Sequence, residues 1–147
     1  MIFLVHHADA VGPEVDAQRP LSAAGRAHAE RLATEAAARG VKPVAIWHSG
    51  KLRARQTAEV FRRTCNPPAE LAAIRGLRPD DPPNQLQTGL AGESRDVMLV
   101  GHMPNLPRLL QALLGGQQGE PLASFPQHGL VALEPDGERW AERWRLG

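Results

Sequence analysis

Residues 2–7 of the chain read IFLVHH, a short apolar run that ends in two adjacent histidines. An uninterrupted apolar run predicts a β-strand that is covered on both faces, as strands are inside a parallel sheet. Two similar runs also lead into a histidine, at residues 44–47 before His48 and at residues 97–100 shortly before His102. Parallel strands end along one edge of a sheet, where open α/β proteins bind ligands. The pattern therefore predicts that histidines distant in the chain become neighbours there.

Helical segments separate these strands. Ser22 is a suitable N-cap for a helix over residues 23–39, Gly40 follows as its terminating glycine, and a second helix is predicted over residues 52–63. The other predicted elements are a strand at residues 71–74, a short helix with Leu86 and Leu90, a helix at 105–114, and strands at 130–133 and 140–146. The last strand alternates apolar and polar residues, as an edge strand does. Strands that alternate with helices predict one domain over residues 1–147, a three-layer α/β/α sandwich with a mostly parallel sheet.

The charges of the chain nearly cancel. Its 147 residues include 17 Lys and Arg against 16 Asp and Glu, a net charge of +1 with histidine neutral. This balance removes the electrostatic argument for a nucleic acid or an anionic membrane as partner. The single cysteine, Cys65, excludes an internal disulfide framework and is typical of a reducing compartment. The opening apolar run is far shorter than the roughly 20 residues of a membrane span, so we expect a cytoplasmic protein.

Several polar residues have alternative interpretations. His48 is either a site residue or only a polar residue where a strand meets solvent, and the two readings are evenly balanced. His28 lies inside the first predicted helix, and we expect it on the surface. Asn105 begins a later helix, and we expect it to cap that helix.

A metal site is a separate hypothesis. The residues that could converge as N/O ligands are His6, His7, Asp9, His48, His102 and His128. Adjacent residues of a strand point to opposite faces, which argues against joint ligation by His6 and His7. No His-x-x-x-His or comparable spacing occurs. The sequence therefore favours chemistry without a metal or another cofactor.

Three stretches of the chain resemble the histidine phosphatase superfamily, also called phosphoglycerate mutase-like. They read LVHHA at residues 4–8, SGKLRARQTA at residues 49–58 and VGHMP at residues 100–104. The short chain and the segment RPLSAAG at residues 19–25 are similar to the phosphohistidine phosphatase branch, called SixA-like. The match spans most of the chain in the family's order. It implies a phosphoglycerate mutase-like fold and a phosphatase.

The resemblance also implies roles for individual residues. His7 would be the nucleophile, which attacks phosphorus in line and forms a phosphohistidine that water then hydrolyses. A backbone carbonyl that holds the other ring nitrogen would fix the required tautomer. Arg53 and His102 would bind the phosphoryl group, and Arg19 would lie near the pocket. Arg53 has independent support, because the first turn of a helix favours an anion.

Position 6 departs from the family pattern, which has arginine where this chain has His6. Histidine offers one donor towards the site and a charge that depends on pH, whereas arginine offers a permanently charged fork. We expect His6 to bind phosphate, and protonated His6 and His102 would make the positive charge of the pocket vary with pH. Loss of one preorganised donor typically costs about 10²- to 10³-fold in rate. Two hypotheses follow: a slow or acid-favoured phosphatase, and a phosphate-binding or regulatory domain with weakened catalysis.

The remaining candidates belong to the rim of the pocket. The Glu-containing signature of family members with sugar-phosphate substrates is absent after the third strand, which leaves Asp80 and Asp81 as candidates for the general acid. Aspartates beside prolines are often turn residues instead. His48 and His128 are the candidate rim histidines. The few insertions predict an open pocket, which suits either a phosphorylated protein side chain or a small phosphate ester.

Overall fold

Every strand and helix expected from the sequence is present in the structure, a computed structural model that describes residues 1–117 and 119–147. Residue 118, in the expected loop before the fifth strand, lies outside the described residues. The strands are β1 (Ile2–His6), β2 (Ala45–His48), β3 (Glu70–Ala73), β4 (Val97–Gly101), β5 (Leu130–Asp136) and β6 (Arg139–Leu146). The helices are α1 (Ala23–Ala38), α2 (Leu52–Cys65), α3 (Asn84–Leu90) and α4 (Asn105–Leu113). Their ends differ from the predicted ends by a few residues at most.

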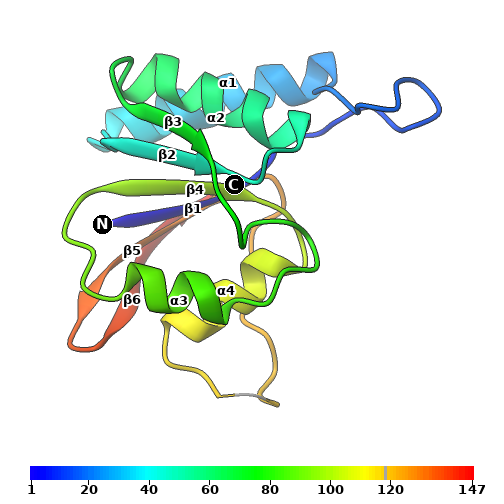
Figure 1. Ribbon diagram of the computed structural model, residues 1–147. Helices are drawn as coiled ribbons and strands as arrows, with labels where there is room; N and C mark the ends of the chain where they lie inside the picture. Colours follow the sequence, from blue (N-terminus) through cyan, green and yellow to red (C-terminus); the bar gives the residue numbers. More distant parts are fainter. Residues whose placement is uncertain (118) are drawn as a thin grey trace.

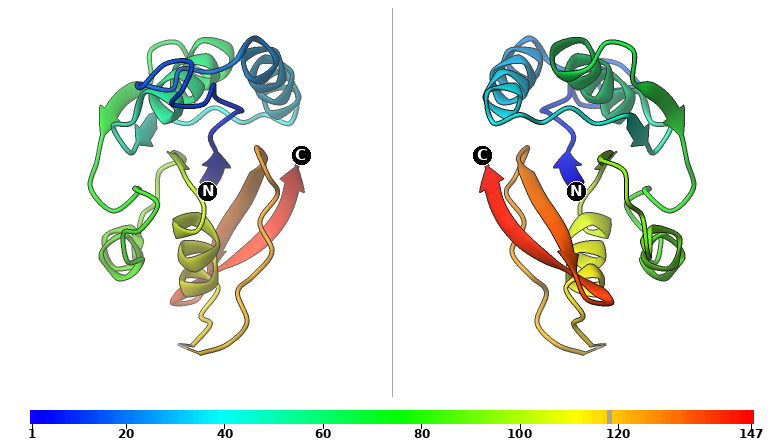
Figure 2. Two further views of the ribbon diagram at one scale, coloured as in Figure 1. Left: turned by 90° about the vertical axis from the view of Figure 1, so that its right-hand side faces the viewer. Right: turned by 90° about the vertical axis from the view of Figure 1, so that its left-hand side faces the viewer.

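The strands form one six-stranded sheet in the order β3-β2-β4-β1-β5-β6. Strands β1 to β4 run parallel, whereas β5 pairs antiparallel with β1 and with the edge strand β6. Helices α1 and α2 cover one face of the sheet, and α3 and α4 cover the other (Figures 1 and 2). The three-layer α/β/α prediction with a mostly parallel sheet is confirmed.

Residues of β1 alternate between two hydrophobic cores. Phe3 and Val5 pack in the core beneath α1 and α2, and Ile2 and Leu4 pack in the core beneath α3 and α4. All four are at most 2% exposed. Burial of each such side chain stabilises the fold by about 1.5–3 kcal/mol. This is why an unbroken apolar run, and not an alternating one, leads up to the two histidines.

The start of α1 fixes the segment that follows His7. The Ser22 hydroxyl accepts from the backbone N–H of Gly25 over 3.0 Å and donates to the Asp9 carboxylate over 2.7 Å. A Cβ atom on Gly25 would collide with the backbone carbonyl of Asp9. Glycine is therefore required for this close packing of α1 against the segment, and the predicted N-cap at Ser22 is confirmed.

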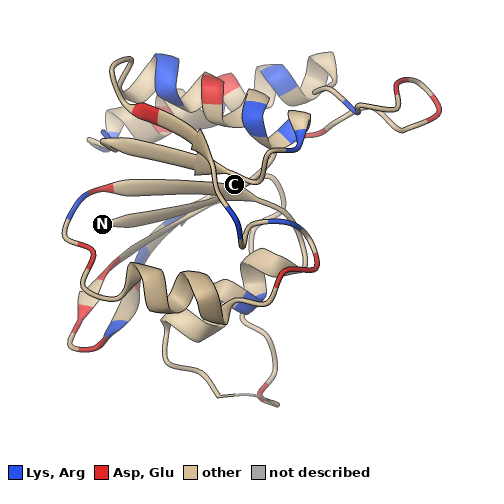
Figure 3. Ribbon diagram, in the orientation of Figure 1, with Lys and Arg blue, Asp and Glu red and all other residues tan. Residues whose placement is uncertain are grey.

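Acidic and basic residues are interspersed on the surface, as Figure 3 shows, and α3 carries no charged residue at all. An exposed pair joins Arg55 to Glu59 on α2 over 2.9 Å. Exposed pairs of this kind contribute little to stability. Within the described ranges, no helix has the length and apolar character needed to cross a membrane.

Candidate active site

Histidines from separate parts of the chain meet at one edge of the sheet. β1 pairs with β4 in parallel, with His6 opposite Gly101, so the residues after both strands leave the sheet on the same side. The ring centroids of His6 and His7 lie 4.5 Å apart, and those of His7 and His102 lie 4.9 Å apart. The predicted convergence of these three side chains is present.

His7 presents an uncharged ring nitrogen to this edge. Its Nδ1 lies 2.7 Å from the carbonyl oxygen of Ala8. A carbonyl can only accept, so Nδ1 carries the proton and Nε2 keeps its lone pair. Burial, with a smaller effect of Arg53, lowers the pKa of His7 to about 4, although the bond to Ala8 opposes this shift. At neutral pH His7 is therefore a neutral base, which is the state that nucleophilic attack requires.

Thr57 connects this loop to α2. Its hydroxyl accepts from the backbone N–H of Ala8 over 3.0 Å and donates to the carbonyl of Arg53 over 2.8 Å. The backbone beside His7 is thereby tied to the first turn of α2, which carries Arg53. Thr57 is 1% exposed, so water does not compete for these bonds.

Two buried donors in this region have no partner among the described residues: Nε of Arg53 and Nδ1 of His102. The Oγ atom of Ser49 lies 2.7 Å from Nε2 of His102 and accepts from the backbone N–H of Lys51. We assign the hydroxyl proton to the bond with Nε2, which leaves the proton of His102 on Nδ1. A buried unpaired donor costs about 1–3 kcal/mol. Both donors are therefore suited to the oxygen atoms of a ligand.

Burial keeps two of the site histidines neutral. It lowers the pKa of His6 to about 3 and that of His102 to about 3, and the neighbouring histidines and Arg53 lower both pKa values further. The expectation that protonated His6 and His102 charge the pocket is therefore wrong for the free protein. These buried rings cannot hold protons beside other positive groups.

The positive charge of the free site comes from arginines. Burial and the charge of Arg19 lower the pKa of Arg53, and Arg19 also lowers the pKa of His7. Arg19 reaches the site from the loop before α1, where its Nε donates to the carbonyl of Val11 over 3.0 Å. Its backbone φ is +52°, an uncommon value for a side chain of this size. No carboxylate contributes to these shifts, so the site favours an anion.

His128 packs against His6 and His7. Its backbone N–H donates to Nδ1 of His6 over 2.8 Å, and its own Nδ1 lies 2.6 Å from the carbonyl oxygen of His7. The rings of His6 and His128 stack at 4.7 Å with an angle of 9° between their planes. Because Nδ1 of His6 accepts a hydrogen bond, its proton is on Nε2. His6 is thus a neutral donor.

Similarity to known proteins identifies the family of the chain. The family model of the histidine phosphatase superfamily (branch 1) matches residues 3–78, just over half of the chain. The chain belongs to this superfamily. This membership supports a phosphatase in general terms. No curated protein sequence matches the chain.

Solved structures agree with the superfamily assignment. The protein histidine phosphatase SixA, complexed with tungstate, shares 22% identity, covers 99% of this chain and 95% of its own, and gives a TM-score of 0.84. A candidate phosphohistidine phosphatase SixA from Agrobacterium tumefaciens shares 30% identity over 99% of this chain and 97% of its own, with a TM-score of 0.75. A candidate alpha-ribazole-5'-P phosphatase from Escherichia coli shares 16% identity over 97% and 93%, also with a TM-score of 0.75. The phosphoglycerate mutase-like fold and the SixA-like resemblance are confirmed.

His48 lies apart from this cluster. Its Nδ1 accepts from the backbone N–H of Gly50 over 3.1 Å. Burial lowers its pKa, and the charges that also act on it belong to Arg55 and Glu59 of α2. Its position is that of a buried residue at a strand end.

The two aspartates lie in a turn. The Asp81 carboxylate accepts from the backbone N–H of Arg78 over 3.0 Å, and Asp81 also lines a cavity beside Ser49. In the described parts of the chain, neither Asp80 nor Asp81 forms a hydrogen bond with a site histidine. Asp81, unlike Asp80, lines the same cavity as Ser49, which bonds to His102.

Asn105 does not cap α4, so that expectation is wrong. Its Nδ2 donates to the carbonyls of Gly76 and Asp81 over 3.0 and 2.8 Å, and the side chain is 0% exposed. The N-cap residue is Pro104, which offers no side-chain bond. Asn105 instead ties the loop of the two aspartates to α4, because buried carbonyls need donors.

His28 is not a surface residue, contrary to expectation. It is half-buried on α1, and its Nε2 is buried without a partner among the described residues. Its ring lies 6.5 Å from that of His128. The helix presents this side chain towards the segment before β5, a contact that helical periodicity alone cannot indicate.

The strand-alternation argument against a metal site is also wrong. Ring nitrogens of His6, His7 and His128 lie within 4.8 Å of one another. β1 ends at His6, so the alternation of side chains does not extend to His7. The bond to Nδ1 of His6 nevertheless leaves a proton on Nε2, and the neighbouring arginines repel a cation. The three rings therefore suit an anion better than a metal ion.

Sequence reasoning did not single out Ser49 and Thr57, which hold His102 and the backbone after His7. Both lie within the family-like stretch at residues 49–58, so that resemblance was the available signal. Their partners are distant in the chain, and only the folded structure reveals the bonds.

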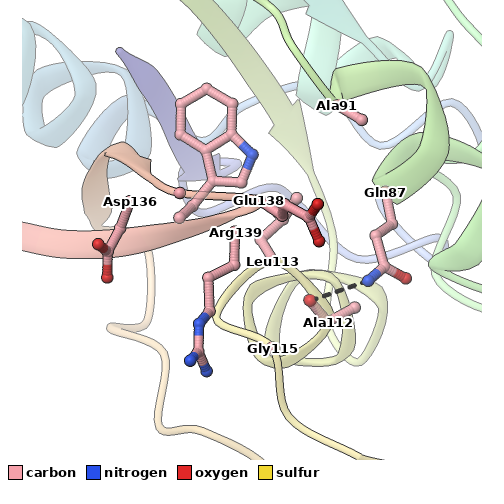
Figure 4. A pocket seen from close by; sticks show the side chains of 10 residues that line it. Gln87, Ala91, Ala112, Leu113, Gly115, Asp136, Glu138 and Arg139 are labelled. Atoms are coloured by element: carbon pink, nitrogen blue, oxygen red, sulfur yellow. Dashed lines mark hydrogen bonds between the residues drawn. The ribbon is translucent and has the colours of Figure 1, made fainter.

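A separate groove lies at the opposite edge of the sheet. It measures about 650 Å³ between α3, α4 and the β5–β6 hairpin, where Gln87 donates to the carbonyl of Ala112 (Figure 4). β5 runs antiparallel to β1, so its end at Asp136 lies far from the histidines. The groove contains no histidine, cysteine, serine or threonine among its lining residues. It is not part of the candidate active site.

Proposed function

We propose that the chain hydrolyses a phosphate monoester or a protein phosphohistidine through a covalent phosphohistidine intermediate on His7. One observation carries this proposal. The neutral His7 lies near two buried donors that have no partner among the described residues, Nε of Arg53 and Nδ1 of His102. A nucleophile and preorganised donors for charged oxygens are what phosphoryl transfer requires.

The reaction would proceed in two displacements. The lone pair on Nε2 of His7 forms a bond to phosphorus while the bond from phosphorus to the leaving group breaks, and the leaving group takes a proton. Arg53 and His102 donate to the non-bridging oxygens, on which charge develops. Water then gives a proton to the group that protonated the leaving group and forms a bond to phosphorus, the N–P bond breaks, and His7 regains its lone pair.

The leaving group of an ester needs a proton donor. We propose Asp81 in preference to Asp80, because Asp81 lines the cavity that also contains Ser49. A phosphohistidine substrate depends less on such an acid, since a protonated imidazole leaves readily. Replacement of Asp81 should thus slow alkyl esters more than aryl esters.

The names of similar proteins support both substrate classes. One is called a protein histidine phosphatase, and another is described as acting on a small ribazole phosphate. The absence of long insertions favours an open pocket, which suits a phosphorylated protein side chain. A parallel assay of a phosphohistidine protein and a set of small monoesters would decide between them.

A second candidate function is a phosphate-binding or regulatory domain with weakened catalysis. His6 favours it, because a neutral ring stands where the family has a permanently charged arginine. Such a domain would bind inorganic phosphate without turning over esters.

Hydrolysis of an aryl phosphate in the presence of a chelator tests the main proposal. We expect turnover by the wild-type chain, none by His7→Ala, and a large loss in Arg53→Ala. Arg55→Ala is the matched control, because Arg55 only pairs with Glu59 on the surface. Turnover retained by His7→Ala would rule the proposal out.

A further inference from the structure

We propose that His128 supplies the positive charge that an arginine at position 6 would have given. When a tetrahedral dianion binds, His128 takes up a proton and donates Nε2–H to it, beside the neutral donor His6. The inference rests on the phosphate site of the proposed function, but not on turnover.

The contact between His6 and His128 defines what each ring can donate. The backbone N–H of His128 holds Nδ1 of His6, so His6 offers a single neutral donor at Nε2. Nδ1 of His128 lies 2.6 Å from the carbonyl oxygen of His7, so Nδ1 carries a proton, and in a neutral ring Nε2 has only a lone pair. Nε2 of His128 becomes a donor only after a second proton binds.

The position of His128 matches a phosphoryl group on His7. Ring nitrogens of His6, His7 and His128 lie within 4.8 Å of one another. A phosphoryl group on His7 would therefore lie beside the other two rings. His6 and His128 would then share the oxygens that an arginine fork binds.

The backbone at His128 supports a functional role. Its φ is +53°, and Arg19 is the other non-glycine residue with a positive φ in the described ranges. Such conformations cost about 1–3 kcal/mol and concentrate at functional sites. His128 is hydrogen-bonded to the backbone of His7, and the charge of Arg19 acts on the His7 ring.

The groups around His128 carry no negative charge. His6 stacks on it, His7 lies 6.0 Å away and His28 of α1 lies 6.5 Å away, measured between ring centroids. Arg53 of α2, Arg19 and His102 complete the titratable groups of the cluster. None of these groups is acidic, so a bound dianion is what would balance an added proton.

Sulfate is the appropriate probe, because it keeps two negative charges across the range in which histidine titrates. Calorimetry in two buffers with different heats of ionisation gives the number of protons taken up. The wild-type chain should take up a proton when sulfate binds. Its affinity for sulfate should then fall as the pH rises through the range in which histidine titrates.

His128→Asn is the decisive variant. The asparagine amide can replace Nδ1 as donor to the carbonyl of His7, the residue tolerates a positive φ, and the backbone N–H that holds His6 is retained. Only Nε2 is lost. We expect no proton uptake and roughly tenfold to a hundredfold weaker sulfate binding in mild acid. His28→Asn is the matched control and should keep the uptake, whereas His6→Arg should abolish it by adding a permanent charge.

Several outcomes would overturn the inference. Unchanged proton uptake in His128→Asn would assign the proton to another residue, as would loss of uptake in His28→Asn. Sulfate binding by the wild-type chain without uptake would contradict this inference and leave the proposed phosphatase intact. Proton uptake without any ester hydrolysis would contradict the proposed phosphatase and leave this inference intact. Failure to bind sulfate would contradict both proposals. If His128→Asn does not fold, the same test is made with His128→Gly, which keeps the backbone N–H that binds His6.

Discussion

Nδ1 of His7 donates to the carbonyl oxygen of Ala8 over 2.7 Å, which leaves Nε2 unprotonated towards the cluster. Burial holds the pKa of His7 at about 4, below its ordinary value of 6.5. We therefore predict that the His7 ring titrates close to pH 4 in an NMR titration of labelled histidines, with its signals assigned by their loss in His7→Gln. An exposed ring would titrate near 6.5, and such a midpoint for His7 would contradict the nucleophile state described above.

Arginine at position 6 should increase activity. His6→Arg places two or more charged donors where a neutral ring now offers one, so kcat/KM for an aryl phosphate should rise by about 10²- to 10³-fold. His6→Lys, which adds charge without the planar fork, should give a smaller rise. Unchanged activity in both variants would mean that His6 and its neighbours already provide the required stabilisation.

Ser49 should act through His102. Its hydroxyl bonds to Nε2 of His102 over 2.7 Å and thereby holds the Nδ1 proton in the site. Ser49→Ala should lower kcat by roughly tenfold, because the ring is then free to rotate or to change tautomer. Ser49→Thr keeps the hydroxyl and should restore the rate. A threonine variant as slow as the alanine variant would argue for a packing defect instead.

The buried neutral histidines should make the fold sensitive to acid. The pKa values of His6, His7 and His102 are about 3, 4 and 3, below the value of 6.5 expected in an unfolded chain. The unfolded chain therefore binds more protons below about pH 6.5, and the free energy of unfolding falls as the pH decreases towards 4.

Urea unfolding at a series of pH values checks this sign. His6→Asn removes one of the three groups. Its free energy of unfolding should therefore fall less steeply with decreasing pH than that of the wild type, by a slope that corresponds to about one proton. Equal slopes for the two proteins would show that His6 titrates alike in the folded and unfolded chains.

The histidines at strand ends were predictable because the cause is local. An unbroken apolar run indicates a strand that is buried on both faces. A histidine that follows such a run lies at the edge of the sheet where the strand ends. On this basis the sequence predicted that His6, His7 and His102 lie close together. His48 follows the same pattern, but its Nδ1 accepts from the backbone N–H of Gly50, and the charges that act on it belong to Arg55 and Glu59 of α2. Strand ends thus predict the edge, and not the face to which each side chain points.

The sequence predicted His128 at the rim of the pocket, but not its hydrogen bonds to His6 and His7. β5 joins the sheet antiparallel to β1, which brings the segment before β5 beside His6 and His7. Its positive φ is also invisible in the sequence, because histidine is not a residue that turn patterns select. Asn105 shows the same limit: its residue type predicts a cap, while the buried carbonyls of Gly76 and Asp81 decide its actual bonds.

Detection of the phosphoenzyme tests the central claim most directly. The wild-type chain is mixed with an aryl phosphate and quenched in alkali, which preserves phosphohistidine, and its peptides are then analysed by mass spectrometry. We predict one added phosphoryl group on the ring of His7, formed within the first turnover and lost as water completes the reaction. Turnover without a phosphorylated peptide, or a phosphoryl group on His6, His102 or His128 in place of His7, would contradict the account.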